Sequence, residues 1–297
     1  MATGITLSST SNLSSGQKIF IEQAMLANEP AAPNPDLIGN ERIETGVKQW
    51  DINTYARLES AGALSEGVDL SEVQQLTTAN LAITPSEHGI IVTLSNRLIR
   101  RQGDSSVVGV AGEQAGASLR RRMDLDVIAL FDGFSKSAVG ATNQLDITHF
   151  RGAVSYLLTD NESAYGPAPL PIDASLHIEQ ISDIILDLSD PGTAAGGRPA
   201  GFGDELLKNW WKGRDRLYGI GIFHSGNISK DSGEDAKGAI LSKNALYLVI
   251  ANDADVTEET DNSLRAVEYG AFQEWGEAER ADPHGVEVFS DASSTLT

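Results

Sequence analysis

The feature that most constrains this 297-residue chain is a long, thin arrangement in its first half, from Glu41 to Phe134. Two stretches with strand-like character, Val47 to Leu58 and Leu81 to Leu94, flank a tip rich in Gly, Ser and acidic residues. Such a hairpin has too few apolar residues to build a core, and a two-stranded ribbon is marginal alone in water. We therefore expect it to pack on something else, most simply another copy of the chain.

A proline-free stretch follows the hairpin and is expected to form one long helix from Asp104 to Phe134. Gly109, Gly112 and Gly116 each cost about 1 kcal/mol relative to Ala in a helix interior, so irregular first turns are expected. Beyond them, apolar residues recur at spacings of three or four and form one stripe. Its members are Leu119, Met123, Val127, Leu130 and Phe134.

The rest of the chain alternates short helices and strands, which is typical of an α+β fold. Helices are expected at Asp146 to Leu158 and Leu176 to Leu188, separated by a loop with three prolines, and Asp204 is expected to cap a short helix carrying Trp210 and Trp211. The expected strands are Leu217 to Phe223, Ala245 to Ile250, Ser263 to Phe272 and Val286 to Phe289. At the start, an amphipathic patch from Gln17 to Ala27 and a proline spacer indicate either an arm that docks elsewhere or a frayed terminus.

Composition excludes several classes of protein. A formal charge of -20 argues against nucleic-acid binding, and the absence of cysteine excludes disulfides and thiolate metal sites. The start of the chain lacks a signal peptide, and no segment approaches about 18 uninterrupted apolar residues, so neither export by that route nor a membrane span is expected. Residues 251–297 hold twelve acids against two arginines, which indicates a solvated face or one that meets a basic neighbour.

Tests for chemistry give no catalytic residue, cofactor or metal. The nearest approach to a serine-hydrolase turn, from Gly133 to Ser137, lacks its second glycine, and the glycine-containing start of the long helix lacks the lysine of a phosphate-binding loop. The five histidines are dispersed without metal-ligand spacing. The chain is therefore predicted not to be an enzyme.

Three groups of residues are candidates for contacts between copies. The first is the apolar side chains of the hairpin, Trp50, Ile52, Tyr55 and Leu58; the second is the two arginine groups that bracket the start of the long helix, Arg97, Arg100, Arg101, Arg120, Arg121 and Arg122; the third is the pair Trp210 and Trp211. In so acidic a chain, the arginines are expected to pair with carboxylates of another subunit, with a nucleic-acid role second. The tryptophans are packing candidates first and ligand-stacking candidates second.

The order of these segments resembles the major capsid protein of tailed double-stranded-DNA bacteriophages, a shell fold shared with herpesviruses and encapsulins. Three short sequence segments are also similar to that family: Gly62 to Val68 in the hairpin, Tyr218 to Ile222 before His224-Ser225-Gly226-Asn227, and Gly285 to Val288. The resemblance implies five parts: an N-terminal arm (1–40), an extended loop (41–95), a peripheral domain with a spine helix (96–137), an axial domain (138–250) and late strands that return to the body (251–297).

The resemblance also implies what such a chain does. Its copies assemble into pentamers and hexamers of an icosahedral shell in the bacterial host cytoplasm, with scaffolding, portal and possible decoration proteins as partners, and enclose DNA without sequence-specific binding. The resemblance implies no cofactor and no membrane. Lys48 is the only lysine of the extended loop, and no Asn partner is evident, so a covalent cross-link is not predicted. An encapsulin-like cargo compartment is the alternative with the same fold, and a soluble acidic hydrolase is the alternative from another class.

Overall fold

A computed structural model describes residues 20, 32–44, 47–63, 66, 74–102, 104–159, 164–189 and 216–293. The chain divides into two compact units. The first comprises Met1–Pro30, Pro85–Met123 and Ile250–Trp275, and the second comprises Ala31–Thr84, Asp124–Val249 and Gly276–Thr297. Helices and strands are mixed along the chain, so the predicted α+β fold class is confirmed.

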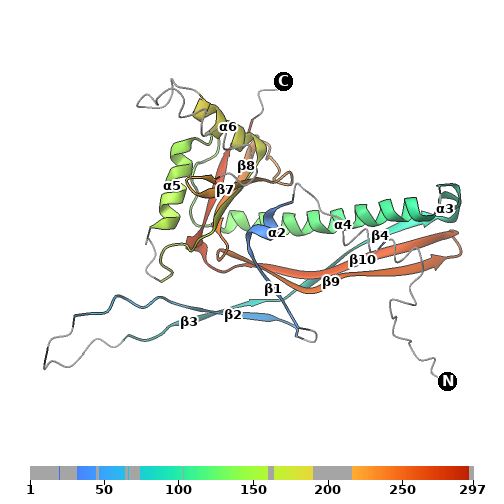
Figure 1. Cartoon of the computed structure of the whole chain (residues 1–297), viewed down its shortest axis with the longest axis horizontal. Coiled ribbons are helices and arrows are strands. Elements are labelled where there is room, and N and C mark those ends of the chain that lie inside the picture. The colour runs from blue at the N-terminus through green and yellow to red at the C-terminus, as the bar shows by residue number, and fades with distance from the viewer. Residues whose placement is uncertain are drawn as a thin grey trace. The chain divides into compact units, whose positions relative to one another are not determined.

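The described residues form helices and strands, most of which are labelled in Figure 1. In chain order these are α2 (Asn34–Leu37), β1 (Gly39–Arg42), β2 (Trp50–Tyr55), β3 (Thr78–Ile83), β4 (Ser86–Ser95), α3 (Asn96–Gln102), α4 (Asp104–Ala129), the 3-10 helix η2 (Leu130–Gly133), α5 (Ile147–Leu158), β5 (Ile172–Leu176), α6 (Ile178–Ser189), β6 (Arg216–Leu217), β7 (Ile220–His224), β8 (Asp235–Ser242), β9 (Leu246–Asp261), β10 (Ala266–Glu279), the 3-10 helix η3 (Asp282–His284) and β11 (Gly285–Asp291). The strands form three sheets, with the orders β1-β9-β10-β4, β11-β8-β5-β7-β6 and β2-β3.

The first unit is built on the antiparallel pair β4 and β10. Its register runs from Ala266 opposite Ser95 to Trp275 opposite Ser86. The alternation predicted for Ile90, Val92 and Leu94 is confirmed, because these three side chains are the less exposed ones on β4, whereas Ile91 between them is 61% exposed. The helix α4 runs along the sheet in Figure 1 and has its own buried stripe, so the sheet has one covered face and one open face.

The hairpin is shorter than predicted, and the single strand from Leu81 to Leu94 is wrong. β3 ends at Ile83 and pairs with β2, whereas β4 begins at Ser86 and pairs with β10. Pro85 lies between the two strands and has no N–H for a ladder hydrogen bond, which explains the break. The residues after Pro85 therefore belong to the body of the first unit.

The long helix is confirmed, but its predicted irregular start is wrong. α4 is helical from Asp104, through all three glycines, and gives way to η2 after Ala129 rather than continuing to Phe134. The buried stripe begins at Val108 and continues through Ala111 and Ala115, so tertiary packing offsets the cost of the glycines. The predicted apolar stripe is buried at Leu119, Met123, Val127 and Phe134, and half-buried at Leu130.

Phe20 is the only described residue of the patch predicted from Gln17 to Ala27. It is fully buried and stacks on Tyr269, with ring centroids 5.2 Å apart. The arm therefore contributes one side chain to the core of its own first unit. The remainder of the patch lies outside the described residues.

The second unit contains the five-stranded mixed sheet and two helices beside it. β5 and β7 are parallel, and the other pairs of this sheet are antiparallel. α5 begins as predicted, because the Asp146 side chain accepts a hydrogen bond from the His149 N–H at 2.7 Å. The helix and sheet faces meet in one apolar core that includes Phe150, Leu157, Ile184 and Ile240.

Several expectations for this unit are corrected. The predicted helix from Leu176 begins two residues later, because Leu176 ends β5, and Ile178 is exposed rather than part of the helical face. The predicted strand Leu217 to Phe223 is broken by a turn at Tyr218 and Gly219, both with positive φ. β5 and β8 were not predicted, since β5 follows directly on three prolines and β8 lacks a polar and apolar alternation. Asp204, Trp210 and Trp211 lie outside the described residues.

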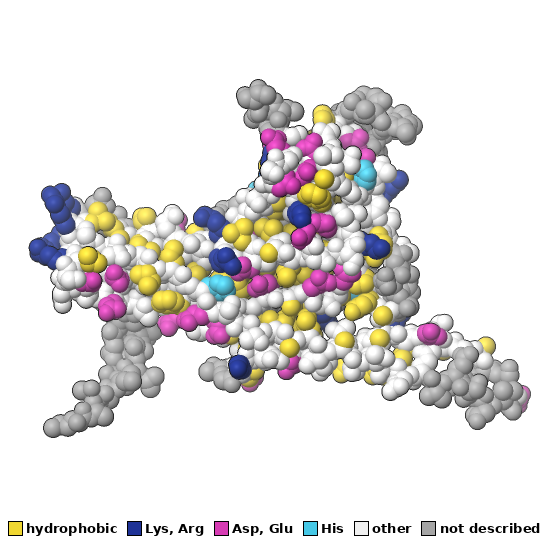
Figure 2. Space-filling model, turned by 180° about the vertical axis from the view of Figure 1, so that it is seen from behind, with side chains coloured by type: hydrophobic (Ala, Val, Ile, Leu, Met, Phe, Trp, Pro, Cys, Tyr) yellow, Lys and Arg dark blue, Asp and Glu magenta, His cyan; other side chains and the backbone are white. Residues whose placement is uncertain are grey.

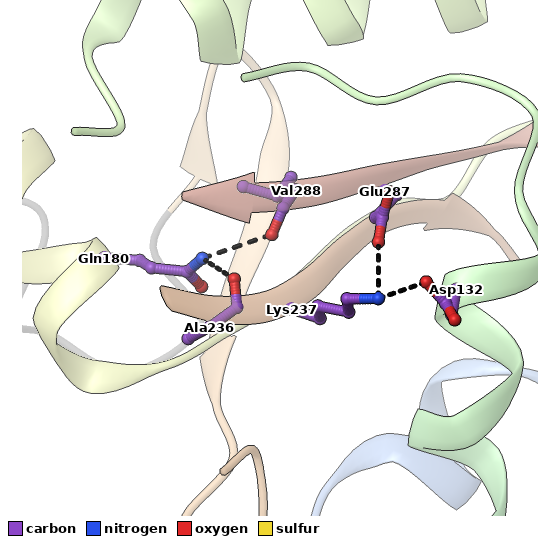
Figure 3. A network of polar contacts seen from close by, with 6 residues as sticks. All are labelled: Asp132, Gln180, Ala236, Lys237, Glu287 and Val288. Atoms are coloured by element: carbon purple, nitrogen blue, oxygen red, sulfur yellow. Dashed lines mark hydrogen bonds and ion pairs between the residues drawn. The ribbon is translucent and has the colours of Figure 1, made fainter. Parts of the chain in front are cut away.

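A fully buried glutamine ties α6 to the sheet (Figure 3). The Gln180 Oε1 atom accepts a hydrogen bond from the His177 N–H at 3.0 Å. Its Nε2 atom donates to the carbonyl oxygens of Ala236 and Val288 at 2.9 and 3.2 Å, and to the Ser290 Oγ atom at 2.8 Å. One side chain therefore joins the first turn of α6 to β8 and β11.

An ion-pair network lies on the same two strands (Figure 3). The Lys237 ammonium bonds to Asp132 of η2, and its Nζ atom lies 3.8 Å from the Glu287 Oε1 atom. The hydrogen bond to Asp132 raises the pKa of Lys237, while burial raises the pKa of Glu287. The network links η2, which follows α4, to the five-stranded sheet.

A second buried hub is the carboxylate of Asp124, which is fully buried on α4. Its Oδ1 atom accepts from the Asn34 N–H at 3.0 Å, and its Oδ2 atom accepts from the Ser225 hydroxyl and the Asn227 amide at 2.9 Å each. The hub joins α2, α4 and the turn after β7. Ser225 and Asn227 belong to one of the three sequence segments on which the family resemblance rests.

We predict that Gln180→Met destabilises the fold while preserving side-chain volume. The four hydrogen bonds are each worth about 0.5–1.5 kcal/mol net, so the free energy of unfolding should fall by roughly 2–6 kcal/mol. Urea denaturation of the purified subunit measures the change. Ser182→Ala, at an exposed position on the same helix, is the control and should have almost no effect. Equal stability of Gln180→Met and the wild type would show that the network contributes nothing net.

A second prediction concerns pH. Burial, together with the nearby carboxylates Asp291 and Glu179, raises the pKa of Asp183 to about 6. Because the folded state holds this proton more tightly than the unfolded state, stability should fall as the pH rises from about 4 to about 6. Asp183→Asn should therefore stabilise the subunit at pH 7–8 and lose this advantage near pH 4. Thermal melts across this pH range measure the difference, with Glu234→Gln at an exposed turn as the control.

Candidate functional site

The β2–β3 ribbon presents two chemically different faces. The register pairs Trp50 with Ile83 and Ile52 with Leu81, so these four apolar side chains lie on one face. Burial on this face declines outward: Ile83 is 3% exposed, and Trp50, Ile52 and Leu81 are only half-buried. The ribbon therefore has an apolar face that its own chain covers incompletely.

Tyr55 and Leu58, the other two predicted contact residues of the hairpin, do not lie on this apolar face. Tyr55 alternates with Ile52 and lies on the opposite face, where it is 57% exposed beside Asp51 and Asn53. That face is polar, and the Asn80 amide donates to the Asp51 carboxylate across it at 3.3 Å. Leu58 lies beyond the end of β2 and is 52% exposed. The predicted set thus divides into Trp50 and Ile52 on one face, and two exposed side chains elsewhere.

Just beyond the end of β2, the chain contacts another segment of its own unit. The Arg57 N–H donates to the Ala164 carbonyl at 2.8 Å, and a Cβ atom on Gly166 would lie 2.9 Å from the Arg57 Nη1 atom. Gly166 has a φ of +75°, a conformation that glycine adopts without strain. The segment from Ala164 to Gly166 is therefore a seat for the ribbon.

A buried histidine lies against this seat. The Tyr165 and His284 rings meet edge to face with centroids 6.0 Å apart. Burial lowers the pKa of His284, opposed by its contact with the Gly166 backbone and assisted by the Arg280 guanidinium. His284 is therefore favoured in its neutral form, because burial and the nearby Arg280 guanidinium both disfavour a positive charge on the imidazole.

The two predicted arginine groups lie apart along the helices that carry them. Arg97, Arg100 and Arg101 are exposed on α3, whereas Arg120 lies sixteen residues beyond Asp104 on α4, or about 24 Å along the helix axis. Arg120, Arg121 and Arg122 have interaction partners within the chain. The α3 arginines have no ion-pair partner among the residues that the structure describes.

No group of three His, Asp or Glu side chains among the described residues has a metal-binding arrangement. None of the described helices combines the length and apolar character needed to cross a membrane. The surface features that remain are the apolar ribbon face and the charged faces of the first unit.

Sequence reasoning missed the seat and the Asp124 hub. Both depend on contacts between segments 90 or more residues apart, which local spacing does not reveal. The only local signal was the glycine before Pro167, since Gly-Pro marks a turn. Nothing in the sequence indicated that this turn would meet Arg57.

Comparison with known proteins identifies the fold. No family model matches the sequence, and no curated protein is significantly similar to it. The head structure of Helicobacter pylori bacteriophage KHP40 aligns with a TM-score of 0.67 at 10% identity, over 90% of this chain and 92% of that chain. The capsid of a native GTA particle aligns with a TM-score of 0.63 at 14% identity, over 89% of this chain and 91% of that chain. The capsid of cyanophage P-SCSP1u aligns with a TM-score of 0.60 at 14% identity, over 99% of this chain and 96% of that chain. This chain therefore has the fold of these head and capsid chains.

We predict that Gly166→Ala weakens the seat of the ribbon. The left-handed backbone costs a non-glycine residue about 1–2 kcal/mol, and the new methyl group would also press on Arg57. In an Arg57→Ala background only the backbone cost should remain, so the two changes should be non-additive. Gly219→Ala is the matched control, because Gly219 has a φ of +84° with open space around it. Urea unfolding of the four variants measures this, and simple additivity would contradict the contact.

Proposed function

We propose that this chain is the major capsid protein of a tailed double-stranded-DNA bacteriophage. In this proposal its copies form the pentamers and hexamers of an icosahedral shell, and the chain is a structural component of the virion with no catalytic activity. The fold shared with phage head and capsid chains supports this proposal over nearly the full length of the chain. The observation that carries it is the ribbon face of Trp50 and Ile52, which its own chain covers only in part.

The physical argument is one of incomplete burial. Each Å² of apolar surface removed from water contributes about 25 cal/mol, and among the described residues no third strand pairs with this ribbon of two six-residue strands. A neighbouring copy supplies that cover in a shell, where the same contact repeats by symmetry. Many modest interfaces of this kind then add up to a stable container.

The charge of the chain is consistent with this role. A container wall with a formal charge of -20 per subunit has little tendency to bind the DNA that it encloses. Scaffolding, portal and decoration proteins, assembly in the host cytoplasm, and the five-part division predicted from the sequence belong to the same proposal. The ribbon of the extended loop then spans Trp50 to Ile83, and the strand that follows belongs to the peripheral domain.

The alternative with the same fold is an encapsulin-like compartment, which encloses protein rather than DNA. The content of native particles distinguishes the two functions. Packaged DNA would support the capsid, and a protein cargo would support the compartment. An acidic hydrolase would instead remain a small particle with activity. No described feature favours either alternative.

The decisive experiment is an assembly assay on Ile52→Ala and Trp50→Ala. Both variants should give folded subunits by circular dichroism that fail to close shells in electron microscopy and gel filtration, because the change removes apolar contact between copies. Asn53→Ala, on the polar face of the same strand, is the matched control and should assemble normally. Shells from both apolar variants at wild-type yield would contradict the proposal, and so would loss of the folded subunit, which would place the ribbon in its own core.

A further inference from the structure

Three arginines form a single exposed face on α3. Arg97, Arg100 and Arg101 have the i, i+3, i+4 spacing that aligns side chains on one side of a helix. All three are exposed and have no ion-pair partner among the described residues, although the chain has an excess of twenty negative charges. Figure 2 shows Lys and Arg side chains gathered at the end of the first unit where α3 lies. This face is therefore positively charged and open.

The open face of the sheet in the same unit has the opposite charge. The register places Glu87 of β4 directly opposite Glu274 of β10, and the neighbouring β9 adds Asp255 and Glu259 at exposed positions. Like charges at directly opposed positions destabilise a strand pair. The cross-strand pair of carboxylates is thus a local cost that a cation from outside the sheet would remove.

A shallow hollow lies at this pair of carboxylates. It has a volume of about 230 Å³ and is lined by Glu87, Asn252, Asp255, Thr257, Phe272, Gln273 and Glu274. Three carboxylates and an aromatic ring in one hollow suit a guanidinium, which bonds to carboxylates in a fork and stacks on aromatic faces. Every residue of the hollow belongs to the first unit.

We infer that the arginine face of α3 in one copy docks on the Glu87 and Glu274 face of the sheet in a second copy. The inference rests on the proposed function, because it assigns a contact within the assembled shell. The two surfaces are different, so the contact is heterologous, and repeating it forms a ring of subunits when the rotation between copies closes. Nucleic acid bound to α3 would leave the Glu87 and Glu274 carboxylates without a compensating cation. A metal ion in the hollow would leave the α3 arginines without a partner. A second copy of the chain provides a partner for both surfaces.

Charge reversal tests this contact in the full chain. Arg97→Glu with Arg100→Glu, and separately Glu87→Lys with Glu274→Lys, should each raise the concentration needed for assembly by roughly tenfold or more. Because each copy carries both surfaces, a chain with all four changes restores complementarity and should assemble near the wild-type concentration. Arg151→Glu with Lys243→Glu makes the same charge change at exposed positions of the second unit and should have little effect. Light scattering and electron microscopy measure assembly, and thermal melting checks that each variant folds.

The outcomes separate this inference from the proposed function. If the wild type forms shells and both reversed variants do so equally well, the contact is wrong and the capsid role stands. Failure of the four-change chain to recover, while each half remains folded, also overturns the contact. If the Arg97 and Arg100 variant assembles normally but loses binding to duplex DNA, the arginine face is a nucleic-acid surface. A wild type that stays monomeric at high concentration would refute the proposed function itself.

Discussion

A two-stranded ribbon cannot bury an apolar face by itself, and this constraint governs how the chain is organised. The register of β2 and β3 gathers four apolar side chains on one face. A shift of one residue would turn them all to the polar side, so the alternation fixes which face needs a partner. Only Ile83, at the base, obtains full cover from its own chain. The pairing of these two strands therefore creates an apolar face that needs contact with another molecule to be fully buried.

The rest of the second unit has a different character, because two fully buried polar side chains in it are held by internal hydrogen bonds. Gln180 and Asp124 are fully buried, and each makes several hydrogen bonds to segments distant in sequence. Satisfied buried networks specify one arrangement of the elements around them, since any other leaves polar atoms unpaired. A rigid body and an incompletely covered ribbon within one unit are the combination expected of a building block.

Sequence reasoning succeeded where the signal is local and failed where it depends on distant partners. The alternation at Ile90, Val92 and Leu94 and the Asp146 cap both follow from neighbouring residues, and both were predictable. The partner of β4 was not, because its strand lies some 180 residues later. β5 and β8 were missed for other reasons: β5 follows directly on three prolines, and β8 is buried over nearly its whole length and shows no alternation.

The candidate surfaces show the same division. The spacing of Arg97, Arg100 and Arg101 is visible in the sequence, but their separation from Arg120 and the carboxylates opposite each other on β4 and β10 appear only in three dimensions. Both the half-covered apolar face and the like-charged strand pair are local conflicts within a fold that is otherwise consistent. Conflicts of this kind persist where contact with another molecule removes them. In the proposed assembly, that molecule is a second copy of the chain, which carries both an apolar surface and an arginine face. Self-assembly therefore explains with one kind of partner what separate ligands would explain only piece by piece.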